Sequence, residues 1–309
     1  MPPVAPLPRR SIDIPTLTGF LDSLQSYSAD LVQHLKSGQG LCHYTTLEGA
    51  IGIVTGNDLR LTHSRYSNDN EEMSYGQRLV DEVLEELKGA ASADAAKLEW
   101  LGKVQTQVLA AREEEEVYIC CFCESGNLLS QWRGYADNGG GVSIQFDSAG
   151  FEQVCGFGNP HGLMRLWKVF YSRTQQCQII RACIEYPYWP VQGDAAIPFI
   201  VDALQFFVPT FKDSGFSEEK ERRLIFTPGE ATTLKPWFRQ RRGMLTPYFS
   251  LRELSNSAVA PGGIAMPIRQ VQVGPGPHKA LNVDSLRMML DAHGHTDAEV
   301  IASPIPYRS

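Results

Sequence analysis

The sequence predicts an α+β fold in which a mostly antiparallel sheet is flanked by peripheral helices. Short runs rich in β-branched and aromatic residues alternate with longer stretches whose apolar residues recur at helical spacing. No internal repeat is found, and 43% of the 309 residues are hydrophobic, which is enough to bury a sizeable core. Strands are expected at 41–44, 59–63, 117–123, 142–146, 166–171, 222–226, 244–251, 268–275 and 300–303. Helices are expected at 14–36, 45–54, 70–88, 94–114, 128–136, 174–185, 195–212 and 280–292.

Two units are expected along the chain: an N-terminal arm and helix at 1–40, and a single α+β domain at 41–309. The Pro-rich start lacks the apolar run of a signal peptide, and no run of about 18 apolar residues suggests a membrane span. The net charge of -7 argues against a global field for nucleic acid. The seven cysteines include no paired C-x-x-C motifs, which argues against a zinc site, and their odd number favours a reducing compartment. We therefore expect a cytoplasmic protein with no membrane partner.

Polar residues gather in five short blocks. The first is His43-Tyr44-Thr45, where a strand ends and a capping box with Glu48 opens a helix. Donors at such a junction suit ribose hydroxyls or phosphate. The second runs from Arg65 through Asn68 to a helix start, and Arg65 is suited to holding an anion. Simple turn and capping roles explain much of both blocks equally well.

The third block contains Trp132 and Tyr135, which share a helical face and either pack in the core or offer a ring to a flat ligand. In the fourth, an extended backbone would place Glu219, Glu221 and Arg223 on one side, so that one carboxylate pairs with Arg223 and the other faces a substrate. A charged helix leading into a strand is the alternative. The fifth is the C-terminal Ser303–Arg308, whose Tyr-Arg ending suits a tail that folds back. A separate basic run, FRQRRG with Arg239, Arg241 and Arg242, is read as a solvated turn.

These blocks, in this order, resemble an uncharacterised bacterial family, a domain of unknown function, over residues 41–308. One departure is Arg222, where that family usually carries an aromatic residue. The resemblance rests on His43-Tyr44-Thr45, Asn68-Asp69-Asn70-Glu71, Cys121-Phe122-Cys123, Trp132-Arg133-Gly134-Tyr135, Gly141–Phe146, Glu219–Leu224, Val273-Gly274-Pro275 and Ser303–Arg308. The family carries no known reaction.

The N-terminal half also resembles the start of ADP-ribosyltransferases, including toxins that modify DNA. This second resemblance implies a split antiparallel sheet and NAD as substrate. It implies that His43 holds the NAD ribose, that Tyr135 stacks on nicotinamide and that Glu221 supports the reaction, with Glu219 as the alternative carboxylate. Arg65 would hold the pyrophosphate, Tyr66 could replace Tyr135, and Tyr44, Thr45, Asn68 and Arg223 would complete the binding site.

The sequence therefore predicts an NAD-dependent ADP-ribosyltransferase or NAD glycohydrolase, as a bacterial toxin or phage-defence effector, with His43, Arg65, Tyr135 and Glu221 lining one cleft. The acceptor, protein or nucleic acid, stays open. A second hypothesis is a magnesium-dependent nuclease using Asp69, Glu71, Glu219 and Glu221, although we expect no bound metal there. The third is a non-catalytic sensor or interaction protein that binds a nucleotide or another small molecule.

Overall fold

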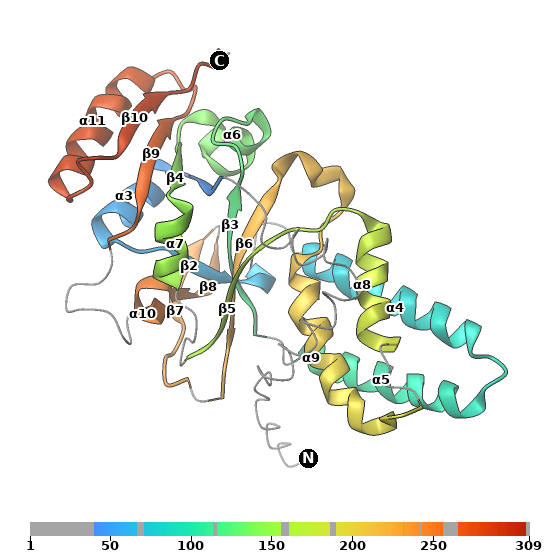
Figure 1. Cartoon of the computed structure of the whole chain (residues 1–309). Coiled ribbons are helices and arrows are strands. Elements are labelled where there is room, and N and C mark those ends of the chain that lie inside the picture. Colours follow the sequence, from blue (N-terminus) through green and yellow to red (C-terminus); the bar gives the residue numbers. More distant parts are fainter. Residues whose placement is uncertain are drawn as a thin grey trace.

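The computed structural model describes residues 40–66, 71–113, 116–155, 161–185, 190–230, 232–241, 243–255 and 265–306. The expected N-terminal arm and helix, Asn68 and the last three residues therefore lie outside the described part. Within it the chain is a mixed α+β structure with a largely antiparallel sheet, as the sequence predicts (Figure 1).

Ten strands form one sheet, and all pairings are antiparallel except that of the last two strands. The strands are β1 (Cys42–Thr45), β2 (Arg60–His63), β3 (Tyr118–Cys123), β4 (Val142–Phe146), β5 (Gly162–Lys168), β6 (Glu221–Pro228), β7 (Trp237–Arg241), β8 (Met244–Ser250), β9 (Ile268–Val273) and β10 (Glu299–Ala302). The order is β10-β9-β4-β1-β3-β2-β8-β7, while β6 pairs with both β3 and β5.

The sheet forks at β3. One edge of β3 pairs along its whole length with β6, from Tyr118↔Phe226 to Cys123↔Glu221. The other edge is shared, because β2 pairs with residues 118–119 and β1 pairs at Cys123 alone. Two branches leave this edge: β1-β4-β9-β10 and β2-β8-β7 (Figure 1). Residues 120–122 lie between the branches.

The helices cover the sheet unevenly. They are α3 (Leu47–Gly56), α4 (Glu71–Ala90), α5 (Ala95–Glu113), α6 (Leu129–Tyr135), α7 (Ser148–Cys155), α8 (Arg173–Glu185), α9 (Ile197–Phe207), α10 (Leu251–Ser255) and α11 (Lys279–Ala292). Short 3-10 turns are η1 (Ser64–Tyr66), η2 (Asp137–Gly139), η3 (Gly193–Ala196), η4 (Val208–Thr210) and η5 (Ser214–Glu219). No helix within the described ranges is both long and apolar enough to cross a bilayer.

The described residues form two large hydrophobic cores and a small third cluster around Trp132. The first lies between the sheet and α3, α7, α10 and α11, and Phe122, Phe146 and Phe151 contact one another in it. The second lies among α4, α5, α8 and α9, which stand beside the sheet (Figure 1). Trp167 of β5 packs edge-on against Phe206 of α9 and joins this helical unit to the sheet. The helices expected at 70–88 and 94–114 are therefore half of a four-helix core.

Strand alternation gives the sheet two faces around the fork. The register aligns Cys42, Cys123 and Glu221 in one row, so these three point to one side, with Arg223 two residues further along β6. We call this side the Glu221 face. His43 follows Cys42 and points to the opposite side, where its ring lies 5.8 Å from that of Phe122. We call that side the His43 face.

Candidate functional site

A cluster of four charged side chains lies on the Glu221 face. Lys212 donates from Nζ to Glu219 Oε2 at 2.5 Å and to Glu221 Oε2 at 3.0 Å. Arg223 donates to both oxygens of Glu221, from Nε to Oε1 at 2.8 Å and from Nη2 to Oε2 at 3.1 Å. The side chains of Lys212 and Arg223 are 2% and 1% exposed. Two carboxylates and two cations therefore form a compact network shielded from water.

The backbone holds this cluster rigidly. The N–H of Glu221 donates to the Tyr171 hydroxyl at 2.8 Å, and its carbonyl accepts from Val169 N at 3.0 Å. Arg223 Nη1 donates to the carbonyl of Pro209 at 2.7 Å. Lys220, in the left-handed region at φ 43°, turns the chain between η5 and β6. The expected extended run from Glu219 is thus wrong, because the strand begins only at Glu221, yet Glu219 still reaches the cluster through Lys212.

The two carboxyl groups differ in electrostatics. Burial raises the pKa of Glu221, but Arg223 and Lys212 outweigh burial and hold that pKa at about 2. Burial raises the pKa of Glu219 above its ordinary value, and the hydrogen bond from Lys212 opposes this without reversing it. Glu221 is therefore a fixed carboxylate, whereas Glu219 lies closer to neutrality.

Glu219 is the member of the cluster that meets the surface. Its side chain is 12% exposed, and Oε1 has no partner within the described part of the chain. Two aromatic rings lie uncovered nearby. Tyr135 of α6 is 37% exposed and Phe216 is 42% exposed, with Lys212 Nζ 4.9 Å from the Phe216 ring centroid. Burial raises the pKa of Tyr135, and Glu219 is close enough to raise it further. A ligand approaching this face would meet the Glu219 carboxylate and, near it, two exposed aromatic rings.

The prediction that His43 lines one cleft with Glu221 is wrong, because the two side chains leave opposite faces of the sheet. His43 Nδ1 lies 3.0 Å from the carbonyl oxygen of Cys121 and fills the edge of β3 that the fork leaves unpaired. Burial lowers the pKa of His43, as do Arg239 and Arg241. Its imidazole is thus a neutral bridge across the fork.

The neighbours of His43 have structural roles. Tyr44 is 6% exposed, and its hydroxyl donates to the carbonyl of Ser125 at 2.8 Å and accepts from Leu128 N at 2.9 Å. Thr46 caps α3 by accepting from Gly49 N at 3.1 Å, so the expected capping box at Thr45 is displaced by one residue. Tyr44 alternates with His43 and so points to the Glu221 face, where it is buried edge-on against Trp132, whereas Thr45 points to the opposite face.

The guanidinium group of Arg65 binds the end of a helix. Its Nη2 donates to the carbonyl oxygens of Arg112 at 2.7 Å and of Glu113 at 3.1 Å. These carbonyls belong to the last turn of α5, where no helical partner remains for them. Arg65 therefore caps a helix, and its guanidinium group is used there instead of for the predicted pyrophosphate contact. Asn68, predicted beside it, lies outside the described residues.

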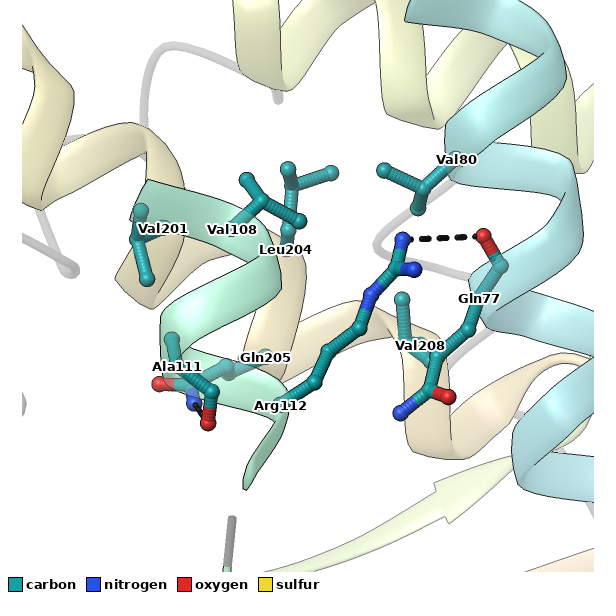
Figure 2. Close-up of a pocket in the computed structure, with 9 residues that line it drawn as sticks. All are labelled: Gln77, Val80, Val108, Ala111, Arg112, Val201, Leu204, Gln205 and Val208. Carbon is teal, nitrogen blue, oxygen red and sulfur yellow. Dashed lines mark hydrogen bonds between the residues drawn. The ribbon is translucent and has the colours of Figure 1, made fainter. Parts of the chain in front are cut away.

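A cavity within the helical unit is too small for an organic ligand. It lies among α4, α5 and α9, and Figure 2 shows Arg112 reaching across it to the carbonyl of Gln77, at 3.0 Å. Its volume is ≈ 20 Å³, which is room for about one water molecule. Arg112 also pairs with Asp81 at 2.8 Å. This cavity is a packing feature of the helices.

Lys212 is the residue that the sequence analysis missed. It stands in a run whose neighbours Phe211 and Thr210 are fully buried, and only this context could have indicated a buried lysine. Within the described residues, no group of three or more His, Cys, Asp or Glu side chains is arranged for a metal ion.

Comparison with known families places this cluster in a stretch that matches one family model. Residues 131–224 match the family model described as a protein of unknown function (DUF2971), which confirms the expected uncharacterised domain family for that stretch. The matched stretch runs from α6 into β6 and contains Tyr135 and all four charged residues of the cluster. No curated protein and no solved structure matches the chain.

Proposed function

We propose that the chain cleaves NAD and transfers or hydrolyses the ADP-ribosyl group, with Glu219 as the carboxylate that faces the ribose. The observation that carries this proposal is the division of labour between the two glutamates. Both oxygens of Glu221 are bonded to cations, whereas Glu219 binds Lys212 through Oε2 alone and lies near the exposed rings of Tyr135 and Phe216. The forked sheet supports the proposal, since a split sheet is what the resemblance to ADP-ribosyltransferases implies.

The chemistry needs a carboxylate in this setting. The bond between ribose C1′ and the nicotinamide nitrogen breaks, and its electron pair passes to that nitrogen. Positive charge then develops on the ribose, as in glycoside cleavage. A carboxylate oxygen held against this charge stabilises it. A nucleophile, which is water in a glycohydrolase, forms the new bond to C1′, and its proton passes to Glu219 or to solvent.

The remaining groups position the reaction. Lys212 fixes Glu219 through Oε2, so that Oε1 points outward without reorganisation. Glu221 and Arg223 hold Lys212 in turn. Tyr135 offers an uncovered ring for the nicotinamide, since 37% of the residue is exposed. Its hydroxyl has no partner in the described part of the chain. The roles predicted for His43 and Arg65 are not part of this proposal.

Nicotinamide release from NAD tests the assignment. Glu219→Gln keeps the shape of the side chain but removes its charge, and we expect turnover to fall about a hundredfold, equivalent to roughly 2.7 kcal/mol. NAD affinity by calorimetry and thermal stability should change little. The matched control is Glu218→Gln, an exposed neighbour, which should match wild type. Wild type that binds no NAD, or equal turnover in Glu219→Gln, contradicts the proposal.

The nuclease hypothesis is disfavoured by the ion pairs. Glu219 and Glu221 already share Lys212, and Glu221 also pairs with Arg223, so their negative charge is balanced without a metal ion. A magnesium ion would have to displace an ammonium and a guanidinium. If the chain is instead a nucleotide sensor, NAD should raise its thermal stability, and no nicotinamide should be released with any acceptor present.

A further inference from the structure

A second group of polar side chains lies on the other branch of the sheet. The register of β2, β8 and β7 places Thr62, Tyr248 and Trp237 in one row, with Arg60 and Arg239 in the rows on either side. Alternate residues of a strand share a face, so Arg241 points the same way as Arg239. Because Thr62 pairs with Ile119, two residues before Cys121, this is the Glu221 face. The expectation of a solvated turn at these arginines is wrong for Arg239 and Arg241, which lie on β7.

The arginines converge on one ring. The guanidinium carbon of Arg60 lies 5.1 Å from the centroid of Tyr248, and that of Arg239 lies 5.7 Å from it. The side chain of Arg239 crosses β8 to reach β2, where its Nη2 donates to Thr62 Oγ1 at 2.8 Å. Tyr248 of β8 therefore brings together two guanidinium groups from the strands on either side of it, β2 and β7.

Arg60 and Arg239 place two positive charges close together at this ring. In the described part of the chain no carboxylate pairs with Arg60 or Arg239. Burial lowers the pKa of Arg239, and so do Arg241 and Arg60, which is the sign of mutual repulsion. Arg239 Nε and Thr246 Oγ1, on paired residues of β7 and β8, are buried without hydrogen-bond partners. An anion would relieve the repulsion and add acceptors.

We propose that Arg60, Arg239 and Arg241 form a binding site for the phosphate groups of a nucleotide, with Trp237 as the platform for its base. Guanidinium groups bind phosphate through two parallel hydrogen bonds, and several of them suit a diphosphate. Trp237 shares the face and is 53% exposed, while its Nε1 donates to Glu253 Oε2 at 2.8 Å and fixes the ring. A nucleotide held here lies along the same sheet face as Glu219, across the fork.

This site is independent of the catalytic proposal. Two sources supply the same chemistry: the ADP half of NAD, and a separate nucleotide. The fork lies between the arginines and the carboxylate cluster, so both sources are compatible with the register. The experiment below distinguishes them.

Binding of ADP and of NAD is measured by calorimetry on the full chain. Wild type should bind ADP, and Arg60→Gln and Arg239→Gln should each weaken that binding about tenfold. Trp237→Ala should weaken ADP but leave inorganic pyrophosphate unchanged. The matched control is Arg269→Gln, an exposed arginine on β9, with unchanged affinity. Arg60 is exposed, so Arg60→Gln reports binding even if Arg239→Gln lowers stability.

The outcomes separate the two sources and the two proposals. If both arginine variants weaken NAD binding as much as they weaken ADP binding, the ADP half of NAD is the ligand. If they weaken only ADP binding, the site takes a separate nucleotide. No ADP binding to wild type, or binding that neither arginine variant changes, overturns the inference. Glu219→Gln should leave ADP affinity unchanged, so a failure of the catalytic proposal is read from turnover and not from this measurement.

Discussion

Arg223 and Glu221 form a two-point ion pair within one strand, two residues apart on the same face of the sheet. The side chain of Arg223 is 1% exposed and that of Glu221 is 6% exposed. Burying such a pair costs desolvation energy that the interaction must recover, and the extra bonds from Lys212 and to Pro209 complete the recovery. The cluster is therefore sensitive to the loss of a single member.

Removing Arg223 alone should destabilise the fold strongly. Removing Arg223 and Glu221 together should cost less than the two single losses added. Arg223→Leu leaves a buried carboxylate with one cation, and we expect a loss of about 3–5 kcal/mol in the free energy of unfolding. The double variant Arg223→Leu/Glu221→Leu should lose much less than the sum of the two single variants. Urea denaturation measures all three. Costs that add within about 0.5 kcal/mol would show that the pair is not coupled.

Acid should weaken this part of the fold through Glu221. Its folded pKa of about 2 lies below the value in the unfolded chain. Its contribution to stability is therefore present above the unfolded pKa of about 4.3 and is lost as pH falls through the folded pKa. We expect the stability difference between wild type and Glu221→Gln to shrink by about 3 kcal/mol between pH 6 and pH 2. Glu219 has the opposite sign, since its raised pKa favours the folded state on protonation. Because Glu221 contributes to that rise, the Glu219 effect is smaller in the variant and offsets part of the change. A difference constant over this range contradicts the assignment.

Local patterns predicted most elements within a few residues. The apolar run at 117–123 became β3, and 142–146 became β4, because β-rich sequence and short length leave few alternatives. The basic run at β7 was missed because its charges mask the alternation of Trp237, Arg239 and Arg241. Gly243, in the left-handed region at φ 78°, was the available turn signal between β7 and β8.

The site was harder to predict than the elements. Glu219, Glu221 and Arg223 are neighbours in sequence, so their grouping could be seen, whereas Lys212 joins them through tertiary packing. His43 was placed with Glu221 because the resemblance to ADP-ribosyltransferases assigns both residues to one NAD site. A strand's side chains alternate, so a shift of one residue in register moves a side chain to the other face. No pattern within β1 or β6 reports that register. The role of Arg65 likewise depends on where α5 ends, 47 residues away along the chain.

Arg65 should matter for stability and not for ligand binding. Arg65→Ala removes two hydrogen bonds to the last carbonyls of α5, and we expect a loss of about 0.5–1.5 kcal/mol. Arg65→Lys keeps the charge at the helix end and should recover part of this. Thermal melting measures stability, and calorimetry measures NAD affinity. A variant of normal stability with weakened NAD binding would restore the pyrophosphate role predicted from the sequence.

Tyr135 should act through its ring and not through its hydroxyl. The hydroxyl has no partner in the described part of the chain, while 37% of the residue is exposed beside Glu219. Stacking on a flat ring is worth about 0.5–1.5 kcal/mol beyond buried area. Tyr135→Phe should therefore keep NAD affinity and turnover, and Tyr135→Ala should weaken NAD binding by up to about tenfold. Leu129→Ala, an equally uncovered apolar residue on α6, is the control and should leave affinity unchanged. Loss of turnover in Tyr135→Phe would assign the hydroxyl a role in the reaction. Full affinity in Tyr135→Ala would remove Tyr135 from the site, leaving Phe216, on the other side of Lys212, as the ring to test next.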